Sequence, residues 1–135
     1  MYSTKLSVSI HILSVVALKG TDPVTSEYIA SSINTNPALV RRLMSRLKKA
    51  KLIEASTKLG VTGLARKEEE ITILDIFRAV EDNPYLFSIH GNTNHKCPVG
   101  AKIESTLENL YASIQSATEE KLSAITLADI TKEFV

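Results

Sequence analysis

The stretch NPALVRRLMSRLKKA, residues 36–50, decides the fold because it combines two patterns on one predicted helix. Asn36 is a favourable helix cap, and Pro37 stands at the first helical position, where its missing N–H costs nothing. Apolar residues then recur at helical spacing, and cations fill the positions between them. The spacing predicts a helix over 37–50 with one buried face (Val40, Leu43, Met44, Leu47) and one basic face (Arg41, Arg42, Arg46, Lys48, Lys49).

This basic helix belongs to a chain of 135 residues whose net charge is only +1. The charge is unevenly distributed: residues 37–66 have a net charge of +7, whereas residues 67–135 have a net charge of −6. Such asymmetry favours a polyanion-binding surface in the middle of the chain. A solvated basic helix face is the alternative.

Composition restricts the class of protein. Hydrophobic residues make up 44% of the chain and charged residues 23%, which is typical of a globular domain. A single cysteine excludes an intrachain disulfide and suits a reducing compartment. No apolar run approaches the roughly 18 residues of a membrane span. We therefore expect a cytoplasmic protein with no membrane partner.

The residues before the basic helix predict the first part of a helix-turn-helix. A helix is expected over about 4–19, ended by Gly20, although the alternation in KLSVSIHI would also suit a strand. After the turn at Pro23, Thr25 can cap a second helix in SEYIASSI, residues 26–33. Two short helices joined by a short turn, the second of them basic, indicate a helix-turn-helix.

The residues after the basic helix predict a wing. LIEAS (52–56) suits a short strand, TKLGVTG (57–63) a hairpin tip, and LAR (64–66) a returning strand. A helix over about 72–82 follows, opened by the capping pair Thr72 and Asp75. Its expected apolar face is Leu74, Phe77 and Val80. We assign residues 1–82 to a winged helix-turn-helix DNA-binding domain.

Residues 83–135 predict a connecting loop and a dimerisation helix. The loop is irregular, with a short strand expected at 85–89, and the long helix runs from Pro98 to Leu122. A heptad-like seam on one long helix favours a partner helix, and hence a homodimer, over packing on its own domain. The fold class is therefore mainly α with a small β-hairpin wing. A last short helix is expected in ITLADITKEF, opened by the pair Thr126 and Asp129. The seam consists of Val99, Ile103, Leu107, Leu110, Ile114 and Ala117.

In a winged helix-turn-helix the second helix enters the major groove with its N-terminal end toward the bases. Arg41 is able to make a bidentate contact to guanine, and Asn36 to pair with adenine if it is not used as a cap. The N-terminus of the second helix would offer backbone N–H groups to a phosphate. The predicted DNA-binding residues are Thr25, Ser26, Asn36, Pro37, Ala38, Arg41, Arg42 and Lys58 at the wing tip, with Arg46, Lys48 and Lys49 as phosphate contacts or solvated cations.

Several stretches, in order, resemble the Rrf2 family of bacterial winged-helix transcriptional regulators. They are STK (3–5), TSEYIASSINTNPALVRRLMSRLKKAKLI (25–53), GVTGLAR (60–66), EEITILDIFRAVE (69–81), CPVG (97–100) and ITLADI (125–130). The resemblance implies a dimeric DNA-binding repressor or activator with a long C-terminal dimerisation helix. Lys5, in the first of these stretches, is included among the predicted DNA contacts.

The chain departs from this family in its cysteines. Cluster-binding members carry three closely spaced cysteines before the long helix, whereas this region contains only Cys97. A [2Fe–2S] centre needs about four ligands, so we predict no cofactor. Cys97 stands next to a helix N-terminus and after Lys96, which both favour a thiolate and hence a redox-sensing role. A packing or capping cysteine is the alternative, and a zinc site with His90 and His95 is a less favoured one.

Two other function classes compete with a transcriptional regulator. A winged helix that binds protein instead of DNA remains the alternative, because the second half of the chain is acidic. A small thiol oxidoreductase is not favoured, since the chain has no CxxC motif and no glycine-rich phosphate loop. We therefore predict that the protein is not an enzyme.

Overall fold

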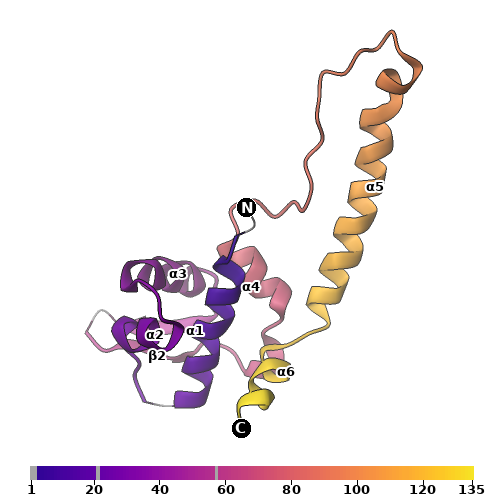
Figure 1. The fold of residues 1–135 in the computed structure, drawn as a ribbon. Helices are drawn as coiled ribbons and strands as arrows, with labels where there is room; N and C mark the ends of the chain where they lie inside the picture. The colour runs from indigo at the N-terminus through magenta and orange to yellow at the C-terminus, as the bar shows by residue number, and fades with distance from the viewer. Residues whose placement is uncertain (1–2, 21, 57) are drawn as a thin grey trace.

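The first half of the chain forms three helices and a hairpin in the computed structural model, which describes residues 3–20, 22–56 and 58–135 (Figure 1). The helices are α1 (Lys5–Lys19), α2 (Ser26–Ile33) and α3 (Pro37–Lys49). The predicted caps begin the last two: Thr25 accepts a hydrogen bond from the N–H of Tyr28, and Asn36 from that of Ala38. The first segment is a helix, so its alternative assignment as a strand was wrong.

The wing consists of β1 (Ile53–Ser56) and β2 (Gly60–Leu64), paired antiparallel. The returning strand begins and ends earlier than predicted: Gly60, Val61 and Gly63 pair with β1 and were wrongly assigned to the hairpin tip, and β2 ends at Leu64 instead of Arg66. Residue 57 lies outside the described residues. A long-range contact accounts for the difference: the N–H of each of Val24 and Val61 donates to the carbonyl of the other, at 2.8 Å. This bridge holds β2 extended where local turn residues alone suggested a loop.

The helix α4 (Ile73–Val80) begins at the predicted capping box of Thr72 and Asp75, after a short 3-10 helix, η1 (Glu68–Glu70). Its buried face differs from the prediction. Ile73, Ile76 and Val80 are buried, whereas Leu74 and Phe77 are only half-buried. The reason is that α4 contacts α1 and α3 on one side and α5 on another, so its flanks are covered as well as its centre.

A single hydrophobic core joins the N-terminal helices to a segment near the other end of the chain. Leu127 of α6 (Leu127–Thr131) has no exposed surface and packs in this core, and a short 3-10 helix, η2 (Lys132–Phe134), follows α6. The N–H of Ile73 donates to the carbonyl of Ile125, and the N–H of Leu127 to that of Ile71. The division after residue 82 stays a prediction. Residues 1–82, the predicted DNA-binding domain, share their hydrophobic core with α6. The fully buried side chains of this core include Ile12, Leu13, Ile29, Leu43, Leu47, Val61, Ile76 and Leu127.

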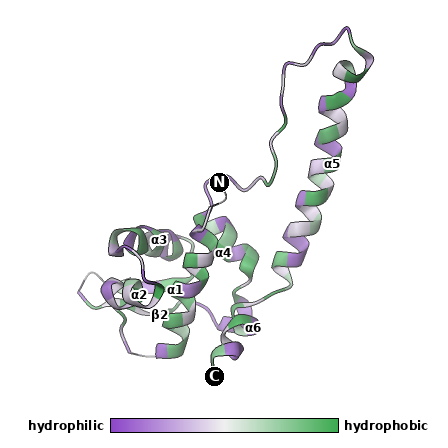
Figure 2. Ribbon diagram, viewed as in Figure 1, coloured by the Kyte–Doolittle hydropathy of each residue, from purple (hydrophilic) through white to green (hydrophobic). Residues whose placement is uncertain are grey.

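The long helix α5 (Pro98–Ser123) extends away from the other helices, with the irregular segment 83–97 beside it (Figure 1). Its 26 residues span roughly 39 Å at about 1.5 Å per residue. The strand predicted at 85–89 is absent from the described structure, because this segment bonds to side chains of α5 instead of to another strand. Hydrophilic and hydrophobic residues alternate along α5 (Figure 2), and no described helix is apolar over the length that a membrane crossing requires.

Candidate nucleic-acid interface

The helices α2 and α3 form the predicted helix-turn-helix. The turn is made by Asn34, whose left-handed conformation (φ 63°) ends α2, while the N–H groups of Asn34 and Thr35 both donate to the carbonyl of Ala30. Asn tolerates this conformation better than most residues do. Val40, Leu43 and Leu47 on the inner side of α3 are buried, whereas Met44, also predicted for this side, is half-buried. The turn and the core together fix the direction in which the outer side of α3 points.

The outer side of α3 carries the residues expected to read DNA. Arg41 has 57% of its side chain exposed and lies 3.6 Å from the carboxylate of Glu27, an exposed ion pair that is easily exchanged for another partner. Ser45 shares this side one turn beyond Arg41 and was not among the predicted residues, because a serine adds no charge to the basic pattern. The spacing from residue 41 to residue 45 was the available signal. The exposed residues on the outer side of α3 are Ala38, Arg41, Arg42, Ser45, Lys48 and Lys49.

The N-terminal end of α3 leaves Asn36 unavailable to a base. Its Oδ1 accepts a hydrogen bond of 2.7 Å from the N–H of Ala38, so the condition attached to adenine pairing, a free side chain, is not met. Pro37 occupies the first turn, as expected, and is half-buried. Ala38 and Arg41 are therefore the residues at this end of α3 that remain available to contact bases.

Lys5 and Arg46, two cations predicted to contact DNA or solvent, form ion pairs with Asp82 instead. The Nη1 atom of Arg46 lies 2.6 Å from one oxygen of Asp82 and donates to the carbonyl of Val80, while Nζ of Lys5 lies 2.6 Å from the other oxygen. Hydrogen bonds from Lys5 and then Arg46 lower the pKa of the Asp82 carboxyl. Arg46, expected to meet phosphate or water, thus links α3 to the end of α4. The DNA contact predicted for Lys5 remains a prediction, and its ammonium would have to leave Asp82 to make it.

The wing tip and the start of α2 are held together. Gly60 has φ of 84°, and a Cβ there would lie 2.4 Å from the carbonyl oxygen of Val24. Lys58 is exposed at the tip, and its N–H donates to Oγ of Ser56. Leu59 beside it is 56% exposed, a residue that sequence reasoning missed. The tip thus presents one cation and one apolar side chain.

Thr25 and Ser26, at the start of α2, have different roles. Thr25 is exposed but uses its hydroxyl as the cap. Ser26 is buried and its hydroxyl faces Glu27, so the predicted phosphate contact at this helix start is left to backbone N–H groups.

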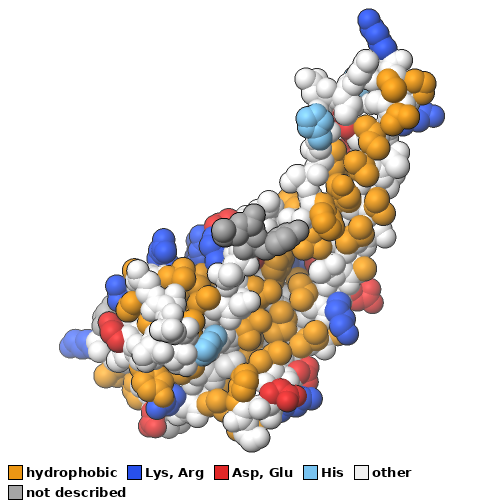
Figure 3. All heavy atoms as spheres, viewed as in Figure 1, with side chains coloured by type: hydrophobic (Ala, Val, Ile, Leu, Met, Phe, Trp, Pro, Cys, Tyr) orange, Lys and Arg blue, Asp and Glu red, His pale blue; other side chains and the backbone are white. Residues whose placement is uncertain are grey.

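The charge of the region remains largely unneutralised. In the described parts of residues 37–66, ion pairs involve Arg41, Arg46 and Arg66. Figure 3 shows Lys and Arg side chains gathered on the part of the molecule that α2 and α3 occupy. The cations of residues 37–66 that have no ion pair with a described residue are Arg42, Lys48, Lys49, Lys51 and Lys58.

The predicted dimerisation residues lie along α5, none of whose residues is buried. Leu110 is 51% exposed, and Val99, at the start of the seam, is 67% exposed. Ile103, Leu107 and Ile114 are half-buried. Figure 3 shows hydrophobic side chains running along this helix. Dimerisation through them stays a prediction.

Cys97 is exposed and occupies the N-cap position of α5. The backbone N–H groups of Gly100 and Val99, at the start of α5, lower the pKa of the thiol by stabilising its thiolate. Cys97 is also the chain's only thiol. In the described residues, no three His, Cys, Asp or Glu side chains lie close enough together to hold a metal ion. Cys97, His90 and His95 do not form such a group among the described residues.

Comparison with known proteins gives matches that cover almost all of the chain. Residues 2–133 match the family model Rrf2, described as iron-dependent transcriptional regulator. YwnA of Bacillus subtilis (strain 168), named as a candidate HTH-type transcriptional regulator, is 41% identical over 132 residues, which cover 96% of each chain.

Two solved structures are similar over a comparable length. The crystal structure of a candidate DNA-binding protein is 37% identical, with a TM-score of 0.76, covering 93% of this chain and 97% of the other. CymR, the global cysteine regulator of B. subtilis, is 26% identical, with a TM-score of 0.72, covering 98% and 96%.

Proposed function

This chain belongs to the Rrf2 family of transcriptional regulators, and from that premise we propose that α3 and the wing bind operator DNA in a homodimer held together by α5. The observation that carries the proposal is the basic face of α3. It stands on a helix whose other side packs in the core through the buried Val40, Leu43 and Leu47, so the core fixes the direction in which the basic face points. A rigid, exposed and cationic helix in second place of a helix-turn-helix is the arrangement that enters a major groove.

Within this proposal the residues of α3 contact different parts of the DNA. Arg41, near the N-terminal end, donates a pair of hydrogen bonds to a guanine, and it leaves Glu27 to do so. Ser45, one turn on, is able to contact a base edge or a phosphate. Arg42, Lys48 and Lys49 contact phosphates and supply affinity that depends on salt.

The wing and the start of α2 contact the backbone on either side of the groove. Lys58 meets phosphate or the adjacent minor groove, where the apolar Leu59 packs against sugar. The first N–H groups of α2 point to a phosphate. The paired hydrogen bonds of Val24 and Val61 keep these two contacts at a constant separation.

Two copies joined along the α5 seam would present two basic faces to a twofold-symmetric operator. The exposure of Leu110 and Val99 supports this, since apolar residues at coiled-coil spacing normally meet a partner helix. Bound across a promoter, such a dimer represses by excluding the polymerase. The same proposal includes that the protein is a repressor and that it is located in the cytoplasm, together with the chromosome.

A response to oxidants, if it is the signal, falls to Cys97. Its exposure and its lowered pKa support this assignment. With one thiol in the chain, the products open to it are a sulfenic acid, a mixed disulfide with a small thiol, or a link between two subunits.

The test begins with selection of duplexes that the protein binds from a random pool, followed by fluorescence anisotropy on the selected duplex and on a scrambled one. Arg41→Ala should weaken binding to the selected duplex by about 1–3 kcal/mol and reduce the preference over the scrambled one. Lys58→Ala should weaken both more evenly and reduce the salt dependence. Lys102→Ala, which removes an exposed cation on α5, is the matched control and should change neither.

Two results would contradict the proposal. If Arg41→Ala binds like the wild type, α3 is not the helix that reads DNA. If no duplex is selected and weak binding does not respond to salt, the winged helix serves to bind a protein instead.

A further inference from the structure

A groove lies between the segment 83–97 and α5, outside the DNA-binding elements. Its volume is about 430 Å³. Three aromatic side chains line it, Tyr85, Phe87 and Tyr111, together with the carboxylates of Glu108 and Glu119. A space of this size suits a small organic molecule.

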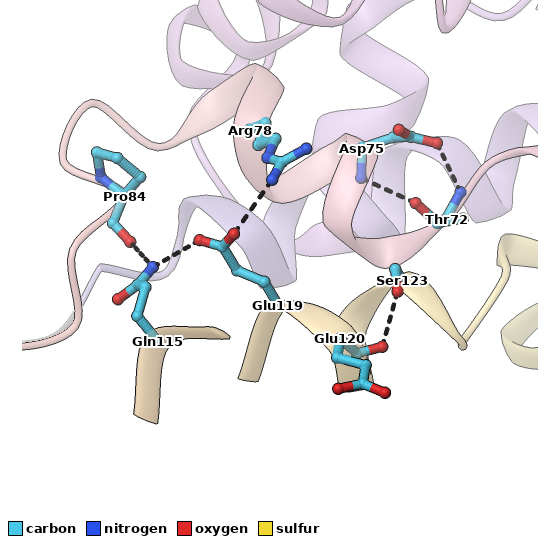
Figure 4. Close-up of polar contacts among 8 residues, drawn as sticks. All are labelled: Thr72, Asp75, Arg78, Pro84, Gln115, Glu119, Glu120 and Ser123. Carbon is cyan, nitrogen blue, oxygen red and sulfur yellow. Dashed lines mark hydrogen bonds and ion pairs between the residues drawn. The ribbon is translucent and has the colours of Figure 1, made fainter. Parts of the chain in front are cut away.

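Both walls of the groove are held in place by hydrogen bonds. Gln115 of α5 accepts from the N–H of Leu86 at 3.0 Å and donates to the carbonyl of Pro84 at 2.7 Å. It also donates to Glu119, whose other oxygen accepts from Arg78 of α4 at 3.1 Å (Figure 4). The rings of Phe87 and Tyr111 pack against each other with centroids 5.2 Å apart and so join the segment 83–97 to α5. The groove is therefore formed before any ligand arrives.

The aromatic lining has no role in the hydrophobic core. The chain has only seven aromatic residues, four Tyr and three Phe, and three of them line this groove. Tyr85 is 71% exposed and Phe87 48% exposed. Exposing large apolar rings around one hollow is unfavourable in water, and it marks a binding site more often than a packing site.

The charge of the lining is negative. Glu108 is exposed and has no ion pair among the described residues, and the groove is lined by no Lys, Arg or His in the described part of the chain. Glu119 stays ionised, because hydrogen bonds from Gln115 and then Arg78 lower its pKa. Aromatic faces and carboxylates both attract cations.

The groove lies beside the proposed dimer seam on α5. Tyr111, Gln115 and Glu119 follow one another at spacings of four, roughly 100° around the helix from the side that carries Leu107, Leu110 and Ile114. Tyr111 is four residues from Leu107 and three from Ile114, so a partner helix on the seam would run along one edge of the groove.

We propose that this groove binds an organic cation with an aromatic body, such as an aromatic amine or a quaternary ammonium compound. The carboxylates would meet the charge, and the rings of Tyr85, Phe87 and Tyr111 would cover the aromatic part. This goes beyond DNA binding, which does not require the groove.

Ligand binding there has a route to the DNA-binding elements. A cation next to Glu119 competes with Arg78 for the same carboxylate, and that ion pair joins α4 to α5. Because α4 packs on α3, a change at this joint reaches the helix proposed to read DNA. The ligand would thus act as an effector.

The experiment uses two xanthene dyes of similar shape and opposite charge, the cation rhodamine 6G and the anion fluorescein. Fluorescence polarisation of each is measured with the full chain and without DNA, so a failure of DNA binding does not affect the result. Rhodamine 6G should bind saturably and more weakly as salt is raised, and fluorescein should not bind.

Variants locate the dye. Tyr111→Leu keeps apolar bulk but removes the aromatic face, so rhodamine 6G should bind roughly two- to fivefold more weakly, whereas Tyr111→Phe should bind as the wild type does. Glu108→Gln should lower the affinity by a similar factor. Glu120→Gln removes an exposed carboxylate of α5 outside the groove and is the matched control. Circular dichroism confirms that each variant is folded.

The proposal is overturned if rhodamine 6G does not bind, if fluorescein binds equally well, or if Tyr111→Leu and Glu108→Gln bind as tightly as Glu120→Gln. Binding with the predicted order of variants supports it. A decrease of DNA affinity in the presence of the dye, lost in Tyr111→Leu, would then establish the effector role.

Discussion

Gly60 shows how one residue positions the wing. The backbone of β2 comes so close to Val24 that no side chain fits between them, and φ of 84° is itself unfavourable for any residue with a Cβ. The hydrogen bonds between Val24 and Val61 depend on this approach. The glycine therefore matters for the placement of the wing relative to α2 and not only for the turn.

Gly60→Ala should lower the free energy of unfolding by about 1–3 kcal/mol, because the added methyl group meets a backbone oxygen that cannot move aside cheaply. Gly63→Ala is the matched control in the same strand, where a Cβ would have nothing within 4 Å, and its effect should stay within about 0.5 kcal/mol. Urea unfolding followed by circular dichroism measures both. Equal effects of the two variants would show that the close approach is not made.

The pKa of Cys97 should be lower in the folded protein than in the unfolded chain, since the N–H groups of Gly100 and Val99 stabilise the thiolate. The measurement is the rate of reaction with a chromogenic disulfide as a function of pH. The same thiol in the urea-unfolded protein is the control, because the chain has no other. A folded value equal to the unfolded one would make Cys97 an ordinary thiol. Cys97→Ser should bind DNA as the wild type does and no longer respond to an oxidant.

The elements of this fold differ in how far local sequence determines them. The starts of α2, α3, α4 and α6 were predictable because Thr25, Asn36, Thr72 and Thr126 cap them through bonds to residues two or three positions away. The strand β2 was misplaced because its partner Val24 is remote in sequence. The strand expected at 85–89 failed for the same reason, since its backbone bonds to α5.

The candidate site follows the same division. Helical periodicity correctly separated the buried side of α3 from its basic face, because both are properties of one helix. The role of Arg46 could not be predicted, since it depends on Asp82, which comes beside α3 only in the folded chain. Leu59 gave no distinctive pattern, and only its exposure in the structure makes it a candidate. Ser45 could have been found from its spacing of four residues from Arg41.

The capping box of α4 makes stability depend on pH through Asp75. Partial burial raises the pKa of this carboxyl, but hydrogen bonds from Thr72 and the charge of Arg66 outweigh it, so the net pKa is lowered. The unfolded chain then takes up the proton first as pH falls. The contribution is present above the unfolded value, near pH 4, and is lost as pH falls through the folded pKa.

Asp75→Asn should therefore destabilise the protein at pH 7 by about 0.5–1 kcal/mol, and should lose less further stability than the wild type between pH 7 and pH 3. Urea unfolding at several pH values gives the two curves. Asp22→Asn, which neutralises an exposed carboxylate before α2, is the control and should leave the wild-type difference unchanged. Parallel curves for Asp75→Asn and the wild type would contradict the role assigned to Asp75.

At the scale of the whole molecule, assembly depends on the side of α5 that carries the seam. Leu107→Glu combined with Leu110→Glu should convert dimers into monomers, because two carboxylates would be buried without partners in the interface. Ser105→Glu combined with Asn109→Glu adds the same charge to exposed positions off the seam and should leave the dimer intact. Light scattering at micromolar concentration distinguishes the two. A wild type that is already monomeric would end the proposal of a dimer.

The return of α6 to the core has a consequence for synthesis on the ribosome. Leu127 fills the same core as α1 and α3, and Thr131 hydrogen-bonds to Glu68. Residues 1–80 therefore emerge well before the side chain that completes their packing, and the whole of α5 must be translated in between. At about 5–20 residues per second the nascent helices wait for seconds with an unfilled apolar site. During that interval they should be substrates for chaperones, and a stop codon within α5 should yield degraded protein instead of a free DNA-binding fragment.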